Sequence, residues 1–187
     1  MIGYFVHGKA TVPRHGIYNY HMTGNGLFVQ SDGRFIRAQV PVAWAKVRGL
    51  EPVEPMMTLV HGKVPLALFN LALNACLAEP DRERYLAFTW EDGYHLWQPE
   101  QTVTESGVEY QTLDNVVLDL HSHGNMRPFF SATDNRDEQG FRLYGVVGRL
   151  RGVPGIRLRV GVYGYFQEVH FEDVFDGPCP IAEDDDV

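Results

Sequence analysis

The sequence predicts an α/β fold made mostly of strands, and three observations support this prediction. Short apolar or alternating runs are separated by turn residues along most of the chain, one segment has clear helical periodicity, and 44% of the 187 residues are hydrophobic. A chain of this length and apolar content can bury a core of its own. We place a boundary near residue 60, between a β-rich N-terminal extension at 1–60 and a main domain at 61–187 that ends in a short acidic tail.

The N-terminal extension has one clear hairpin signal. Residues 26–40, GLFVQSDGRFIRAQV, contain two short apolar runs around Ser31, Asp32 and Gly33, which are typical turn residues. Residues 51–65, EPVEPMMTLVHGKVP, carry three prolines, which donate no backbone hydrogen bond and break helices. We therefore interpret residues 51–65 as a connector between the extension and the main domain.

The main domain begins with its one convincing helix. Pro65 suits a first helical turn, apolar residues recur at helical spacing from Leu66 to Leu77, and Pro80 ends the run. Apolar side chains on the other faces as well predict that this helix is largely buried. Strands are expected at 84–90, 94–99, 107–113, 115–120, 141–150 and 156–171.

Composition excludes several classes of function. The formal net charge of −8 argues against a protein that holds nucleic acid through clustered basic side chains. The N-terminus lacks the charged start and apolar core of a signal peptide, and the longest apolar run is too short to cross a bilayer. Cys76 lies in an apolar run and Cys179 near the C-terminus, so we expect a buried thiol and a tail thiol without a disulfide framework. We expect a cytoplasmic protein that does not contact membranes.

The sequence matches several known nucleotide-binding and zinc-binding motifs only in part or not at all. Residues 3–9, GYFVHGK, have the glycine and lysine spacing of a phosphate-binding loop, but Ala10 replaces the required serine or threonine. The sequence has no H-E-x-x-H zinc-protease helix, and no P-C-x-x-C follows its histidine pair as in zinc deaminases. His7, His15 and His21 are scattered among turn residues, and we interpret them as surface or core histidines.

The stretch HSHGNMRPFFSATD, residues 121–134, carries the strongest candidate site. An extended backbone sends alternate residues to the same face, so His121 and His123 can point at one spot while Ser122 points away. The following loop can fold back so that Asp134 adds a carboxylate. Two imidazoles and one carboxylate leave the fourth zinc position to water, and the ion then lowers the pKa of that water to about 7.

This stretch resembles a known family. His121, His123, Ser131 and Asp134 reproduce the H-x-H-x7-S-x2-D pattern of the JAMM metalloproteases of the JAB/MPN family. The resemblance covers residues 61–175 and implies a deaminase-like mixed sheet flanked by helices, with one zinc ion per chain. It does not account for residues 1–60, where we expect an extension that covers the core or helps to receive substrate.

A group within this family is similar in more detail. The bacterial PRTRC system protein A group has D-x-HSHG, FFSATD and VVGRL, found here at 119–124, 129–134 and 146–150. One departure from the wider family is Gly124, where many members have proline after the second histidine. We expect this change to loosen the loop without removing a ligand.

The resemblance also implies two catalytic roles. The family uses a glutamate, placed between the first helix and the next strand, as general base toward the zinc-bound water. Glu83 and Glu79 both lie in this interval, and we favour Glu83 because it directly precedes the expected strand, although both can also be solvated surface charges. Ser131 would donate its hydroxyl to the oxyanion, or cap the turn into Asp134, or do both.

The resemblance implies a zinc-dependent metallopeptidase or isopeptidase that cleaves after the C-terminal tail of a ubiquitin-like modifier. The PRTRC gene set includes proteins that resemble such a modifier and its activating enzyme, so the expected partner is a ubiquitin-like protein or its conjugates. The alternative is a catalytically silent JAB/MPN binding module for such a partner. Silent members typically lose a ligand, whereas this sequence retains the complete set. The sequence leaves the exact bond and the oligomeric state open.

Overall fold

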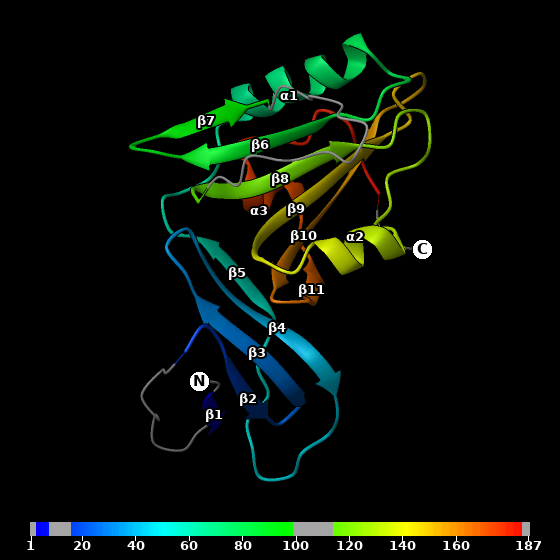
Figure 1. Cartoon of the computed structure of the whole chain (residues 1–187). Coiled ribbons are helices and arrows are strands. Elements are labelled where there is room, and N and C mark those ends of the chain that lie inside the picture. Colours follow the sequence, from blue (N-terminus) through cyan, green and yellow to red (C-terminus); the bar gives the residue numbers. More distant parts are fainter. Residues whose placement is uncertain (1–2, 8–15, 99–113, 185–187) are drawn as a thin grey trace, which may run out of the picture. The chain divides into compact units, whose positions relative to one another are not determined.

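The computed structural model describes residues 3–7, 16–98 and 114–184 (Figure 1). The predicted α/β class is confirmed, because two mixed sheets are accompanied by few helices. This arrangement is consistent with the JAB/MPN fold. The strand expected at 107–113 lies outside the described residues.

The N-terminal residues form a five-stranded sheet in which the strands follow one another in sequence order. β1 pairs in parallel with β2, and the other neighbours are antiparallel. The predicted hairpin is confirmed as β3 and β4, whose turn is closed by a hydrogen bond from Gly33 N to Ile36 O. The strands are β1 (Gly3–Val6), β2 (Asn19–Thr23), β3 (Gly26–Asp32), β4 (Ile36–Trp44) and β5 (Met56–Leu59).

Two interpretations of the N-terminal residues can be compared with this sheet. The connector assigned to 51–65 is wrong in part, because Met56–Leu59 forms β5. The three prolines lie outside these four residues, and β5 is an edge strand, which needs hydrogen bonds on one side only. Among the scattered histidines, His21 is buried on β2 with Nδ1 3.1 Å from Gln39 Oε1, as expected of a core histidine.

The strands from β6 onward form a seven-stranded mixed sheet in the order β11-β10-β9-β8-β6-β7, with β12 paired to β10. β8 is a central strand, antiparallel to β6 and parallel to β9. The strands are β6 (Tyr85–Trp90), β7 (Tyr94–Trp97), β8 (Val116–Ser122), β9 (Phe141–Gly148), β10 (Gly155–Val162), β11 (Tyr165–Glu168) and β12 (Ala182–Glu183).

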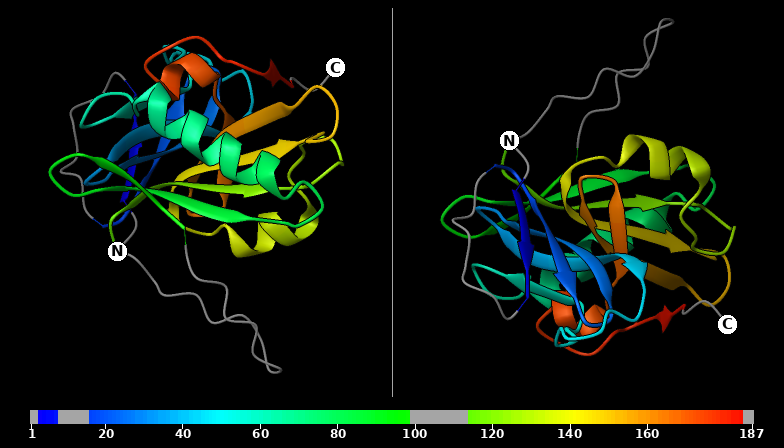
Figure 2. Two further views of the ribbon diagram at one scale, coloured as in Figure 1. Left: turned by 90° about the horizontal axis from the view of Figure 1, so that it is seen from above. Right: turned by 90° about the horizontal axis from the view of Figure 1, so that it is seen from below.

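Three helices accompany these strands among the described residues: α1 (Leu66–Ala78), α2 (Ala132–Asp137) and α3 (Phe171–Val174). α1 lies across one face of the sheet (Figure 2), where Phe69 meets Phe171 and Phe175 with ring centroids 4.8 and 4.9 Å apart. The expectation that α1 is largely buried is wrong, because Leu71 remains 58% exposed. The helix buries one face only, through Phe69, Ala72, Leu73 and Cys76.

Candidate metal centre

The two histidines are placed by the pairing of β8. His121 lies opposite Tyr85 of β6 and Val146 of β9, so hydrogen-bonded neighbours fix the strand on both sides. The next residue, Ser122, is fully buried and points to the opposite face, where its Oγ accepts a hydrogen bond from Arg84 N at 2.9 Å. The predicted alternation is therefore confirmed: both histidines face one side of the sheet, away from Ser122.

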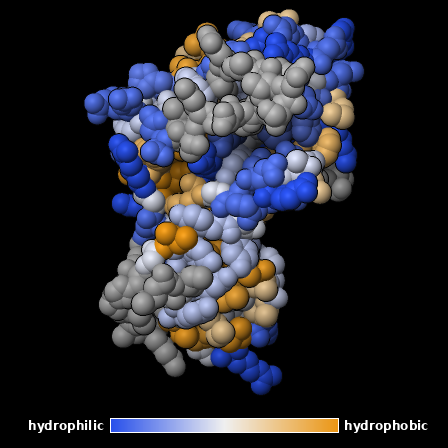
Figure 3. All heavy atoms as spheres, viewed as in Figure 1, coloured by the Kyte–Doolittle hydropathy of each residue, from blue (hydrophilic) through white to orange (hydrophobic). Residues whose placement is uncertain are grey.

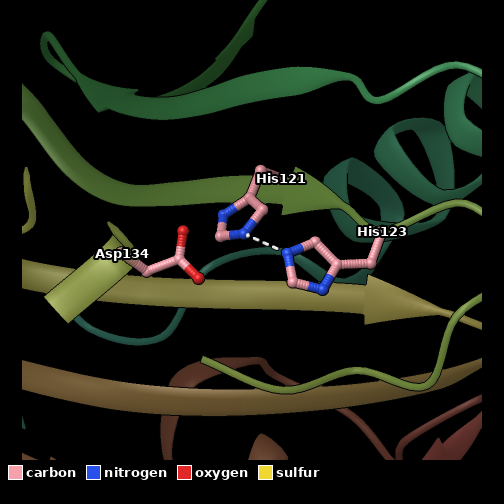
Figure 4. A group of neighbouring side chains, drawn as sticks. All are labelled: His121, His123 and Asp134. Carbon is pink, nitrogen blue, oxygen red and sulfur yellow. Dashed lines mark hydrogen bonds between the residues drawn. The ribbon is translucent and has the colours of Figure 1, made fainter. Parts of the chain in front are cut away.

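The two imidazoles converge through their Nε2 atoms, which lie 3.1 Å apart (Figure 4). His123 is 8% exposed, and its ring packs edge-on against Phe129 with centroids 4.7 Å apart. Its Nδ1 is buried and has no hydrogen-bond partner among the described residues. The His123 backbone N–H donates to Val147 O at 2.8 Å, so the residue stays tied to β9 beyond the end of β8.

Asp134 is held by an N-terminal capping box on α2. The Asp134 N–H donates to Ser131 Oγ at 3.2 Å, and the Ser131 N–H donates to Asp134 Oδ2 at 2.6 Å. The S-x2-D spacing is therefore the spacing of a helix cap, with aspartate at the third helical position. The expected capping role of Ser131 is confirmed.

His121, His123 and Asp134 form a group that could hold a metal ion. One potential ligand atom from each residue lies within 4.8 Å of the others. Zinc–nitrogen bonds of 2.0–2.1 Å at a tetrahedral angle place two nitrogens about 3.3 Å apart, close to the observed separation of the two Nε2 atoms. Figure 4 shows the Asp134 carboxylate directed toward the His121 ring. The donor set therefore fits zinc, and the two imidazole nitrogens already have the spacing of zinc ligands.

The two glutamate candidates lie in different surroundings. Glu79 ends α1 and forms an ion pair with Arg84, at 2.6 Å between Oε1 and Nη2. Glu83 is exposed and lies directly before β6. Because Tyr85 is the partner of His121, the alternation of an extended chain places Glu83 level with His123 and on the same face. This register favours Glu83 as the base, and its role stays a prediction.

The conformation of the loop after His123 explains why position 124 is glycine. Gly124 has φ +56°, which proline cannot adopt, and an added Cβ would lie 2.9 Å from Pro80 O. The Gly124 carbonyl accepts a hydrogen bond from Leu150 N at 3.0 Å, and Arg149 N donates to Met126 O at 2.7 Å. Backbone hydrogen bonds therefore tie this loop to the residues after β9, and the expected loosening relative to proline stays a prediction.

Sequence reasoning did not identify Tyr85 or Asp119 as neighbours of the site. Tyr85 Oη donates a hydrogen bond to Asp119 Oδ1. Asp119 precedes His121 by two residues on β8, and Tyr85 is the strand partner of His121, so both face the histidine side of the sheet. The two-residue spacing from His121 was the available signal for Asp119, whereas Tyr85 required the register of β6.

Comparison with known proteins agrees with this geometry. Residues 66–159 match the family model described as prokaryotic homologs of the JAB domain, which covers half of the chain. The chain belongs to this family. Comparisons with curated proteins and with solved structures gave no match. None of the helices in the described parts of the chain is long and apolar enough to cross a membrane.

We predict that replacing His121, His123 or Asp134 by alanine abolishes zinc retention, because two protein ligands hold zinc poorly. Metal content after gel filtration of protein purified without added metal measures this effect. His95→Ala, which removes an exposed histidine from β7, is the matched control and should keep its zinc. Full zinc occupancy in all three ligand variants would show that the metal lies elsewhere.

Proposed function

We propose that this protein is a zinc-dependent JAMM-type peptidase or isopeptidase that cleaves the bond after the C-terminal tail of a ubiquitin-like modifier. The observation that carries the proposal is the convergence of His121, His123 and Asp134, the ligand positions of the H-x-H-x7-S-x2-D pattern, on one point. Membership of the JAB family supports it, because this family includes hydrolases.

The three proposed protein ligands would not complete the coordination sphere of a zinc ion. His121 and His123 would bind zinc through Nε2, and Asp134 would bind through its carboxylate, so that three protein ligands leave a fourth position open. Zinc in such a site supplies a Lewis acid that polarises the substrate carbonyl and makes hydroxide available at neutral pH. The complete ligand set favours catalysis over a silent binding role.

Glu83 would transfer the proton, and Ser131 would stabilise the negative charge that develops on the oxygen of the scissile carbonyl. The Glu83 carboxylate accepts a proton from the attacking water and returns it to the departing amine. The Ser131 hydroxyl oxygen already accepts the Asp134 N–H, which leaves its own hydrogen free to be donated to the oxyanion. Capping and catalysis therefore use different parts of the same hydroxyl group.

The proposed substrate follows from the similarity to the PRTRC system protein A group. The tail of a ubiquitin-like modifier is flexible and extended, and main-chain hydrogen bonds to a strand would hold it while small tail residues let the scissile carbonyl approach the site. A net charge of −8 suits a modifier with a basic face. We propose that cleavage either matures the modifier or frees it from a lysine.

Glu83→Gln should keep zinc and lose nearly all turnover, because an amide cannot accept the proton while the ligands are unchanged. Glu79→Gln is the matched comparison and should keep turnover, since the Glu79 carboxylate is paired with Arg84. Zinc content and turnover of both variants are measured together. The reverse result would move the base to Glu79.

Ser131→Ala should lower turnover on the order of 100-fold, as the loss of one oxyanion donor does in other hydrolases. The loss of the α2 cap costs about 1 kcal/mol, which corresponds to a fall in zinc affinity of only about fivefold. Turnover and zinc affinity that fall by the same factor would restrict Ser131 to its capping role.

The substrate is tested with the cognate modifier fused through its C-terminus to a reporter protein. The zinc-loaded enzyme should cut at the end of the modifier, and both a chelator and Glu83→Gln should prevent the cut. A fusion whose modifier tail carries bulky residues should resist cleavage, because these residues keep the carbonyl from the metal. Tight binding of the modifier with intact zinc and no cleavage would instead identify a binding module.

A further inference from the structure

Helix α2 carries the third ligand but has no apolar anchor. It is six residues long, and none of its residues is buried. The part of α2 seen in Figure 3 is hydrophilic. Helices this short are unstable in isolation, so contacts outside the helix must fix the position of Asp134.

A buried arginine on β10 supplies such contacts. Arg159 is 5% exposed, and its Nη1 donates to Asn135 Oδ1 at 2.6 Å. Its Nη2 and Nε donate to Glu138 Oε2 at 2.5 and 3.1 Å. The Phe166 ring covers the guanidinium, whose carbon lies 3.8 Å from the ring centroid. The planar guanidinium therefore donates hydrogen bonds to two side chains at once while it is almost fully buried.

Asn135 and Glu138, the two partners of Arg159, both lie close to Asp134 in α2. Asn135 follows Asp134 directly. Glu138 ends α2, and its N–H donates to Asp134 O at 2.8 Å. The Glu138 side chain is 12% exposed, so this ion pair is desolvated and hard to break without leaving a buried charge. Arg159 thus restrains the backbone of Asp134 from the residue after it and from the helix end.

We propose that Arg159 is a positioning residue that holds Asp134 in reach of the two histidines and thereby sets the metal affinity of the site. The proposal rests on the proposed zinc site and adds a residue that acts on Asp134 through Asn135 and Glu138. Residues that orient metal ligands typically contribute 10- to 100-fold to metal affinity.

The main test variant is Arg159→Met combined with Glu138→Met. Removing both members of a buried ion pair is tolerated far better than removing one, so this variant should fold. Arg159→Lys keeps the charge but lacks the planar fork that holds two side chains in a fixed geometry, and it serves as a partial rescue. Asp184→Asn is the control, because it breaks another bidentate arginine pair, with Arg149 at 2.5 and 2.6 Å, to which no α2 residue belongs.

Zinc dissociation constants are measured by competition with a chromophoric chelator, and the visible spectrum of the cobalt-substituted protein reports ligand geometry. Melting temperatures establish that each variant is folded. The double variant should lose about 10- to 100-fold in zinc affinity and change the cobalt spectrum, with Arg159→Lys in between. The control variant should match the wild type. Unchanged affinity in the double variant, or an equal loss in Asp184→Asn, would overturn the proposal.

Amide hydrogen exchange of the metal-free proteins separates this proposal from the zinc site itself. The Asn135 and Glu138 amides donate within the α2 segment, to Ser131 O and Asp134 O. Faster exchange at these amides in the double variant supports the positioning role even if the wild type binds no zinc, a result that would overturn the proposed function alone. Unchanged exchange would overturn the positioning role whatever the metal result.

Discussion

The register of β8 between its two neighbours is the constraint on which the candidate site depends. Pairing with β6 and β9 fixes the direction of every side chain on β8, and a slip of one residue would send both histidines to the opposite face. The opposite face is apolar and covered by α1, so a slipped register would bury imidazoles against apolar side chains. The core therefore selects the register, and the register in turn selects the side of the sheet that the two histidines face.

The third ligand depends on a different kind of interaction. Asp134 lies on a helix that buries none of its residues, and polar contacts take the place of apolar packing there. The cap uses one carboxylate oxygen of Asp134, Oδ2, as the acceptor for the Ser131 N–H. The S-x2-D pair therefore serves local folding as well as the site, and losing either residue removes half of the reciprocal cap.

Local sequence patterns correctly predicted the features that depend on residues close together in the chain. The hairpin at β3 and β4, the histidine alternation and the cap at Ser131 each depend on residues close in sequence, and each is confirmed. The edge strand β5 and the one-sided burial of α1 were missed because both depend on which elements lie alongside. The Arg159 contacts were missed for the same reason, since β10 and α2 are separated by β9 in the chain.

The two faces of β8 differ in how they are stabilised. Behind the histidines, Ser122 of β8 and Cys76 of α1 lie in the core, and burial raises the pKa of the Cys76 thiol to about 11. This thiol stays protonated at neutral pH and is a packing group, although it lies one layer from the site. On the histidine face, polar contacts hold Asp134, whereas the pairing of β8 holds the two histidines. In the proposed zinc site, two of the three ligands would be fixed by the core, so the metal affinity would be adjusted mainly through the polar contacts of α2.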